Sequence, residues 1–286
     1  MEGNEISNCG TINESTGRAN VGRNALAHHW VDCERAFIAQ RYDRIAGLIG
    51  LFDWLFFFPP HLRARAAARL NAEPGGRVLE IGCGTGRNFP HLCAAVGPAG
   101  KVYGVDLSAG MLRKARELCE REQWSNVELT QCDALEYIPP EPLDGILFGL
   151  SYNTMPHHLA VLRHAWKQLR PGGRIVILDG KLPHGFGGKL ALPFGLWLMK
   201  HTMLGNPFIK PWNDLAALVS EANGQRGHSI SARAGHSPEA GSSARAPLAD
   251  EFAMEEFLFG SWYVCWGTKP VHAQTGEAVE QLMAAE

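Results

Sequence analysis

The sequence predicts an α/β fold with a doubly wound, seven-stranded sheet, in which five parallel strands are followed by a C-terminal antiparallel hairpin and preceded by an N-terminal helical cap. Three observations support this prediction. From Arg77 onward, short β-branched runs alternate with helical stretches, as in βαβ units. The first of these runs leads directly into a glycine-rich turn, and two more strand-like runs follow near the carboxyl terminus. A chain of 286 residues with 45% hydrophobic content can form one such domain.

The composition argues against several functional classes. A formal net charge of -2 provides no broad basic field for phosphate backbones, so no nucleic-acid partner is expected. The seven cysteines are odd in number and form no Cys-x-x-Cys pair, which is typical of neither a disulfide framework nor a zinc site. His28 and His29 lack partners at metal-ligand spacing. We therefore expect a cytoplasmic protein without a bound metal.

The amino-terminal region is predicted to have two parts. Residues 1–30 are polar and lack the apolar stretch of a secretory signal, so we expect a flexible tail. Residues 31–74 form the helical cap, which Pro59 and Pro60 divide into two helices. Within the cap, the apolar run Ile45–Phe58 contains a charged residue and is too short to span a bilayer. A packed helix is favoured for this run over peripheral contact with a membrane surface.

The main domain is predicted to span residues 75–270, followed by a tail at 271–286. Its strands are expected at Arg77–Ile81, Lys101–Val105, Val127–Thr130, Leu143–Phe148 and Arg174–Leu178. Helices are expected between them at Asn88–Val96, Ala109–Arg121 and His157–Leu169. The Arg-Pro-Gly-Gly segment at 170–173 is predicted to be a turn that separates the last of these helices from the fifth strand.

The carboxyl-terminal part is predicted to complete the sheet. Pro211–Ser220 is expected to be a helix, and Glu251–Phe257 and Ser261–Gly267 are expected to form an antiparallel hairpin at the sheet edge. The intervening residues 221–250 are rich in Gly, Ser, Ala and Arg, which predicts a disordered loop.

The first strand carries the most informative motif. Val78–Ile81 runs into Gly82, Gly84 and Gly86, and glycine lets a backbone turn sharply and approach a ligand closely. A helix that starts just after such a turn can hold an anionic group. A dinucleotide site requires Gly-x-Gly-x-x-Gly, but the spacing here is Gly-x-Gly-x-Gly and position 87 is arginine. An NAD-dependent oxidoreductase is therefore disfavoured.

Glu80 followed by Gly82, Gly84 and Gly86 resembles motif I of the class I methyltransferases, which use S-adenosylmethionine (SAM). The chain is most similar in appearance to the group of ubiquinone/menaquinone C-methyltransferases and phospholipid N-methyltransferases, and the resemblance covers most of its length. The resemblance implies a Rossmann-like fold, SAM as the cofactor and a small-molecule acceptor.

The resemblance also implies a set of cofactor-binding residues. These are Glu80, Gly82, Cys83, Gly84, Gly86, Asp106, Leu107, Met111, Asp133 and Ala134. Asp106 ends the second strand, where a carboxylate can accept both ribose hydroxyl groups. Met111 is placed to pack on adenine, one turn after the helix-capping Ser108. Asp133, or the backbone beside it, would meet the adenine amino group.

Three residues are candidates for acceptor chemistry. Tyr42 with Asp43 resembles the Tyr-Asp pair of the quinone methyltransferases, where the tyrosine lies over the cofactor; a tyrosine that packs the cap onto the sheet is an equal alternative. Tyr152 and His157 follow the fourth strand and could face the methyl group, although a polar helix start is favoured for the histidine. Asp179, at the end of the fifth strand, could bind substrate or cap a loop.

The segment Lys189–Leu204 is apolar and aromatic, and in the family an insertion here covers the acceptor. Its composition favours a lipophilic acceptor, such as a phospholipid amine or a quinone-like ring, or membrane-surface contact; a lid unrelated to the substrate is the alternative. The fourth strand lacks the Asn/Asp-Pro-Pro-aromatic signature of adenine methyltransferases, which argues against DNA. Two other functions stay open: N- or O-methylation of a polar metabolite, and non-catalytic SAM binding.

Overall fold

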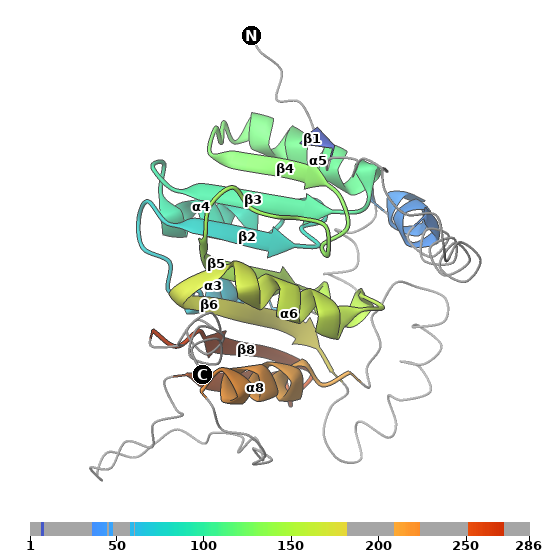
Figure 1. Ribbon diagram of the computed structural model, residues 1–286. Helices are drawn as coiled ribbons and strands as arrows, with labels where there is room; N and C mark the ends of the chain where they lie inside the picture. Colours follow the sequence, from blue (N-terminus) through green and yellow to red (C-terminus); the bar gives the residue numbers. More distant parts are fainter. Residues whose placement is uncertain are drawn as a thin grey trace, which may run out of the picture.

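The computed structural model describes residues 7–8, 36–44, 46–47, 58–59, 61–181, 209–223 and 251–271. Their strands form one sheet in the order β1-β4-β3-β2-β5-β6-β8-β7 (Figure 1). The strands are β1 (Ser7–Asn8), β2 (Arg77–Ile81), β3 (Lys101–Asp106), β4 (Val127–Gln131), β5 (Leu143–Gly149), β6 (Leu169–Gly180), β7 (Phe252–Phe257) and β8 (Trp262–Thr268). β8 runs antiparallel to β6 and β7, whereas the other pairs are parallel. The predicted fold class is therefore confirmed.

One strand of this sheet was not predicted. β1 pairs with β4, so that Ser7 lies opposite Thr130 and Asn8 lies opposite Gln131. Without β1, the outer edge of β4 would leave backbone N–H and C=O groups without strand partners. A short extended segment can pair with such an edge whatever its side chains are. The pairing therefore leaves no pattern in the sequence that could have revealed it.

Helices cover both faces of the sheet (Figure 1). α6 (His158–Gln168) and α8 (Pro211–Ala222) lie on one face, and α3 (His61–Arg69), α4 (Phe89–Val96) and α5 (Ala109–Arg121) lie on the other. The faces have separate hydrophobic cores: Leu79 and Ile81 of β2 pack on the α6 side, whereas Val78 packs on the α3 side. Since side chains alternate along a strand, Glu80 shares the face of Val78 and points toward α3 and α4.

The winding of the chain changes direction between β2 and β5. From β2 the chain moves to β3 and β4, whereas from β5 it moves to β6 on the opposite side. In parallel sheets wound in this way, ligands bind in the crevice at the carboxyl ends of the two central strands. We call the carboxyl ends of β2 to β6 the carboxyl edge. In Figure 1 these strand ends point toward the helix of residues 36–44, which we call the N-terminal helix.

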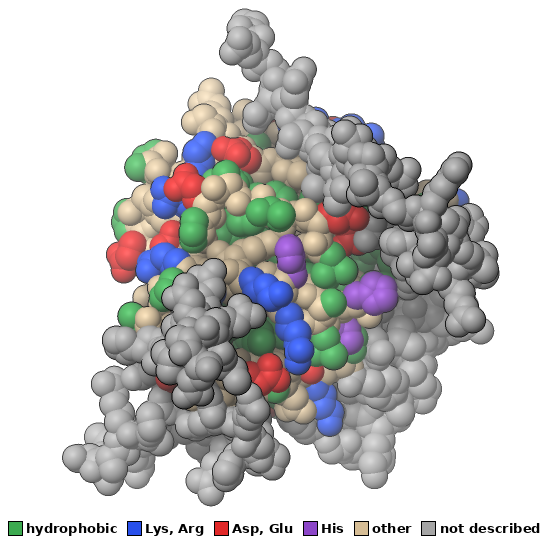
Figure 2. Space-filling view, in the orientation of Figure 1, with side chains coloured by type: hydrophobic (Ala, Val, Ile, Leu, Met, Phe, Trp, Pro, Cys, Tyr) green, Lys and Arg blue, Asp and Glu red, His purple; other side chains and the backbone are tan. Residues whose placement is uncertain are grey.

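The surface carries charges of both signs. On the face shown in Figure 2, Lys and Arg side chains lie among Asp and Glu side chains. Histidine side chains gather around α6 on the same face. Among the helices of the described residues, none has the length and apolar character needed to cross a bilayer.

The Arg-Pro-Gly-Gly segment was predicted to be a turn before the fifth strand, but in the structure it is part of that strand, β6. β6 begins at Leu169 rather than Arg174, and residues 170–173 bulge out of it beside β5. The Gly172 N–H group donates to the Lys269 carbonyl oxygen at 2.8 Å. The bulge is thus held by the chain that follows β8, a contact that the local sequence could not reveal.

From residue 61 on, the other predicted helix and strand boundaries agree with the structure to within two residues. α8 extends to Ala222, and so enters the predicted loop by two residues. Residues 224–250, the segment 189–204 and most of the run 45–58 lie outside the described residues.

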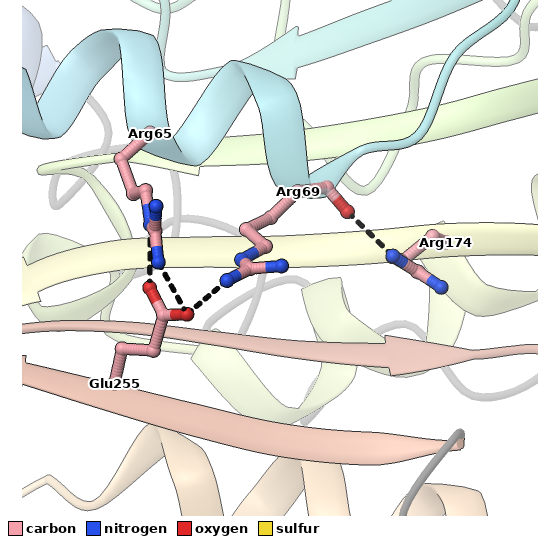
Figure 3. A network of polar contacts seen from close by, with 4 residues as sticks. All are labelled: Arg65, Arg69, Arg174 and Glu255. Carbon is pink, nitrogen blue, oxygen red and sulfur yellow. Dashed lines mark hydrogen bonds and ion pairs between the residues drawn. The ribbon is translucent and has the colours of Figure 1, made fainter. Parts of the chain in front are cut away.

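Glu255 of β7 links the outer hairpin to α3 (Figure 3). Its carboxylate accepts hydrogen bonds from Arg65 Nε at 2.8 Å and Nη2 at 2.9 Å, and it also pairs with Arg69. The Arg69 guanidinium lies 4.5 Å from the Trp266 ring centre, and the Arg69 carbonyl oxygen accepts from Arg174 Nη1 at 3.0 Å. Burial acts to raise the pKa of Glu255, but the hydrogen bonds and charges of the two arginines outweigh it and lower that pKa.

Replacing Glu255 with glutamine should lower the free energy of unfolding by about 1 kcal/mol near neutral pH, because these ion pairs are partly exposed to solvent. Since the folded-state pKa is lowered, the contribution is complete above the unfolded-state pKa and is lost as the pH falls through the folded-state value. The parent and Glu255→Gln should therefore converge in acid. Urea unfolding at neutral and acidic pH measures both effects.

The control for this prediction is Glu117→Gln. This change removes an exposed pair with Lys114 at 2.7 Å, so it should cost less than about 0.5 kcal/mol. Equal losses in the two variants would show that Glu255 contributes no more than an ordinary surface charge.

Candidate active site

The loop after β2 turns sharply at three glycines. Gly82, Gly84 and Gly86 have φ values of 69°, 54° and 79°, a region that other side chains disfavour. A Cβ atom on Gly82 would lie 2.5 Å from the Ser151 Cβ, whereas a Cβ atom on Gly84 would meet nothing within 4 Å. The Gly82 N–H group donates to the Val105 carbonyl oxygen at 2.8 Å. The loop is thus fixed to β3, and at Gly84 it borders open space.

Ser151 joins the two central strands where the winding reverses. Its buried hydroxyl group donates to the Ile81 carbonyl oxygen at 2.6 Å. The N–H group of Leu150 donates to the Leu178 carbonyl oxygen at 2.8 Å, which ties the same loop to β6. These two hydrogen bonds hold the ends of β2, β5 and β6 in a fixed arrangement.

Asp106 ends β3 and faces the glycine loop. Its Oδ2 accepts the Gly84 N–H at 2.8 Å, and its Oδ1 accepts the Ser108 N–H at 2.9 Å. Burial raises the pKa of Asp106, and the backbone hydrogen bonds oppose that rise. A carboxylate oxygen can accept more than one hydrogen bond, so both oxygens can still accept from the hydroxyl groups of a ligand.

Asp43 attaches the N-terminal helix to the carboxyl edge. Its Oδ1 accepts from the Ser108 hydroxyl group at 2.5 Å and from the Gly110 N–H at 2.7 Å. Ser108 in turn caps α5, because its Oγ accepts the Met111 N–H at 3.0 Å. A carboxylate at the start of α5 also interacts favourably with the helix dipole. The attachment brings the neighbouring Tyr42 to the same edge.

Tyr42 lies near acidic groups at the ends of two strands. Burial is the main cause that raises the pKa of Tyr42 to about 12; a hydrogen bond with the Thr154 side chain opposes this rise, and the charges of Asp106 and Asp179 add to it. Interaction with both acids indicates that the phenol lies near the ends of both β3 and β6. At neutral pH the hydroxyl group stays protonated and can donate a hydrogen bond.

Glu80 is a buried acid at the end of β2, with 1% of its surface exposed. Its Oε1 accepts from Asn88 Nδ2 at 2.5 Å, and Asn88 Oδ1 accepts from Arg63 Nη1 at 3.0 Å. Its Oε2 is buried and lacks a hydrogen-bond partner within the described ranges. Burial raises the pKa of Glu80 to about 8, although Asn88 and Arg63 act to lower it. The unpartnered oxygen is suited to accept from a donor on a ligand.

The other predicted cofactor-binding residues lie at the ends of the same strands. Cys83 and Met111 are buried, whereas Leu107, Asp133 and Ala134 are partly exposed. The Oδ1 of Asp133 accepts the Leu135 N–H at 2.8 Å and so stabilises the turn after β4. The structure brings the predicted set to the carboxyl ends of β2, β3 and β4, while their binding of a cofactor stays a prediction.

The three acceptor-side candidates have different surroundings. Tyr42 lies among the acids described above. Tyr152 is fully buried, donates its hydroxyl group to Asp214 Oδ2 at 3.1 Å and packs edge-on against the Phe148 ring at 5.4 Å. His157 is exposed immediately before α6, and its side chain makes no capping hydrogen bond. The contacts of Tyr152 favour a packing role, so Tyr42 is the candidate that its neighbours support.

Sequence reasoning missed several residues of the site. Arg63, Asn88 and Thr154 are partners of the predicted Glu80 and Tyr42, but they lie in α3, at the start of α4 and in the short 3-10 helix η1 (Tyr152–Thr154). A polar residue just after the glycine loop was the one available signal. Within the described part of the chain, no group of three or more His, Cys, Asp or Glu side chains could hold a metal ion.

Comparisons with known proteins identify the class of protein. Residues 78–173 match a family described as a methyltransferase domain. A demethylmenaquinone methyltransferase from Geobacillus sp. (strain WCH70) is 31% identical over 188 residues, which cover 65% of this chain and 77% of that protein. The one from Anoxybacillus flavithermus is 30% identical over 188 residues, covering 65% and 76%. A solved O-methyltransferase family protein from Burkholderia thailandensis shares the fold, with a TM-score of 0.54 at 16% identity over 84% of this chain and 63% of that one.

The fold and the matched family define a methyltransferase domain. The extent of the likeness shows more: the chain belongs to the class I SAM-dependent methyltransferases and is distantly related to demethylmenaquinone methyltransferases. Its methyl donor is therefore SAM.

Replacing Glu80 with glutamine should change how stability depends on pH. The folded-state pKa of about 8 lies above the ordinary value of 4.5, so the folded protein binds more protons in this window and its stability falls as the pH rises through it. Glu80→Gln cannot ionise and should escape this loss. Without SAM, we expect its melting temperature to match that of the parent near pH 4.5 and to exceed it by several degrees near pH 8, because each unit between the two pKa values corresponds to about 1.4 kcal/mol of lost stability. Thermal unfolding at both pH values measures this difference, and parallel pH profiles would contradict it.

Proposed function

We propose that the chain transfers a methyl group from SAM to a small lipophilic acceptor with a quinone-like ring. The observation that carries this proposal is the 31% identity over 188 residues with a demethylmenaquinone methyltransferase, a stretch well beyond the matched domain at 78–173. The proposal concerns the class of ring and not an individual compound. The catalytic domain is proposed to span residues 75–270.

We infer that SAM lies along the carboxyl edge from β2 to β4. The unpartnered Oε2 of Glu80 suits the ammonium group of SAM, which would favour the ionised carboxylate that burial disfavours. The open space beside Gly84 allows close approach to the backbone. Asp106 is oriented to accept the ribose hydroxyl groups, and Met111 and Asp133 lie where the resemblance places adenine.

The role of the chain in the reaction is alignment. When bound, SAM supplies a methyl group on a positively charged sulfur. The protein has to hold an electron-rich acceptor atom in line with that methyl group and exclude water. Tyr42 supports this role, because its protonated hydroxyl group can donate to an oxygen of the acceptor. Asp43 fixes the N-terminal helix that carries Tyr42.

Replacing Asp106 with asparagine should weaken SAM binding about tenfold or more, because a hydrogen bond to a charged group contributes about 1.5–3 kcal/mol. Calorimetric titration with SAM measures the change. Asp144→Asn is the matched control, since Asp144 also accepts a backbone N–H, from Arg77 at 2.7 Å, but lies at the amino end of β5. Its SAM affinity should equal that of the parent. Equal weakening in both variants would contradict a ribose-binding role for Asp106.

The acceptor class is tested with methyl-labelled SAM and an extract of whole cells. After incubation with the parent chain, we expect the label in the organic phase, on a compound with the ultraviolet absorption of a quinone-like ring. Tyr42→Phe should slow this transfer while leaving the affinity for SAM unchanged. Label found only in the aqueous phase would exclude the lipophilic acceptor and point to a polar metabolite. Binding of SAM without any transfer would indicate a non-catalytic SAM-binding protein.

A further inference from the structure

A cluster of buried polar groups lies at the end of β6, away from the glycine loop. Asp179 of β6, Asn153 of η1 and Tyr263 of β8 are 8%, 6% and 0% exposed, and we call them the Asp179 cluster. Asp179 and Tyr263 lie directly opposite each other in the antiparallel pair, so their side chains share one face of the sheet. The Oδ2 of Asp179 accepts the Asn153 N–H at 3.1 Å, and its Oδ1 accepts the Gly180 N–H at 2.8 Å.

Two polar atoms of the Asp179 cluster form no hydrogen bond of normal geometry among the residues that the structure describes, although the Asn153 side chain lies close enough to the Tyr263 hydroxyl group to act to lower its pKa. These are the Tyr263 hydroxyl group and Asn153 Oδ1, and both are buried. A buried polar atom without a partner costs about 1–3 kcal/mol, and native proteins retain few of them. The Tyr263 ring is held by an edge-on contact with Trp212 at 5.2 Å, so its hydroxyl group is not needed for its position. Both atoms are suited to a polar group of a ligand.

Tyr42 connects the Asp179 cluster to the cofactor side of the edge. The charges of Asp106 and of Asp179 both raise the pKa of Tyr42, so its phenol lies within reach of each acid's field. Tyr42 and Thr154 are partly exposed, whereas the cluster itself is buried. A ligand held by Tyr42 would therefore lie near both the cofactor side of the edge and the Asp179 cluster.

We propose that Asp179 takes the proton of a hydroxyl-bearing acceptor during methyl transfer, while Asn153 and Tyr263 hold the group that loses it. This inference rests on the proposed function, although not on the identity of the ring. As the acceptor's O–H proton moves to a carboxylate oxygen of Asp179, the electron pair left on the acceptor oxygen forms the new oxygen–methyl bond. The sulfur–methyl bond breaks, and its electron pair stays on the sulfur. One positive and one negative charge are neutralised, so the step balances.

Among the titratable groups of the Asp179 cluster and its surroundings, Asp179 is the one whose pKa lies near neutrality. Burial raises the pKa of Asp179 to about 6, although two backbone N–H groups lower it, so it is ionised at pH 7 and more basic than an exposed aspartate. The titratable or charged groups around it are Tyr42, Tyr263, Cys265, Lys181 and Glu256. Burial raises the pKa of both tyrosines and of the Cys265 thiol far above neutrality. Lys181 and Glu256 form an ion pair with each other.

The Asp179→Asn variant of the full chain tests this proposal, with methyl-labelled SAM as donor and a whole-cell extract as the source of acceptor. Asparagine keeps the shape of the side chain but cannot take a proton. We expect the SAM dissociation constant to stay within about twofold and the transfer rate to fall about 100-fold or more. The parent rate should rise with pH up to about 6 and then level off, and this inflection should be absent in the variant.

Asp214→Asn is the matched control. Asp214 is also a partly buried acid with a raised pKa, but it bonds to Tyr152 and not to the Asp179 cluster. It should keep the parental rate and the inflection. A rate for Asp179→Asn within about threefold of the parent, or an unchanged inflection, overturns the proton-accepting role.

The same experiment also distinguishes a failure of the Asp179→Asn variant to fold or bind SAM from a failure of the proposed function. If Asp179→Asn fails to fold or to bind SAM, Tyr263→Phe replaces it, because this change removes only the hydroxyl group that the cluster would offer to a ligand. It should raise KM for the extract about fivefold or more with SAM affinity unchanged, and an unchanged KM would overturn the cluster as a binding site. The parent chain reports on the proposed function itself: absence of transfer to either phase overturns methyl transfer, and with it the proton step.

Discussion

The carboxyl group of Glu80 is buried away from water, and several elements of the fold supply contacts that offset the cost of burying it. Asn88, which donates to it, occupies space that exists because residue 149 is glycine; a Cβ atom on Gly149 would lie 2.2 Å from Asn88 Nδ2. Arg63 reaches Asn88 from α3 and lies 4.7 Å from the Phe58 ring centre. β2, β5, α3 and the start of α4 thus share one set of contacts. A shift in any of them changes how readily this acid ionises.

The carboxyl edge has a cofactor side and an acceptor side, and both depend on the N-terminal helix. Asp43 joins this helix to the start of α5, beside Asp106, and the adjacent Tyr42 reaches toward Asp179. Asp106 and Asp179 are each oriented by two backbone N–H groups, so their carboxylates are fixed before any ligand arrives. Because one helix serves both sides, a ligand that moves it on one side alters the geometry on the other.

Much of the fold could be predicted from local sequence, because β-branched runs, glycine spacing and helix periodicity act over a few residues. The expected cofactor-side residues came from the resemblance of the glycine-rich motif to the methyltransferases, and the structure places most of them at strand ends. Features that depend on distant contacts could not be predicted: Arg63 meets Asn88 across 25 positions, and β1 pairs with β4. The orientation of the Tyr152 side chain could not be predicted from the sequence either. Leu150, two residues before it, adopts a φ of 63°, and no glycine in that position signals the left-handed turn.

β8 follows β7 in the chain but lies inside it in the sheet, between β6 and β7. During translation, β6 therefore keeps one unpaired edge until residues 262–268 have left the ribosome. Unpaired edges of apolar strands recruit other extended chains, so the nascent protein is exposed to association from the synthesis of β6 until that of β8. A chaperone that shields this edge before release would raise the yield of folded protein. The strand that closes the edge also delivers Tyr263 to Asp179, so the sheet and the acceptor side of the site are completed in one folding event.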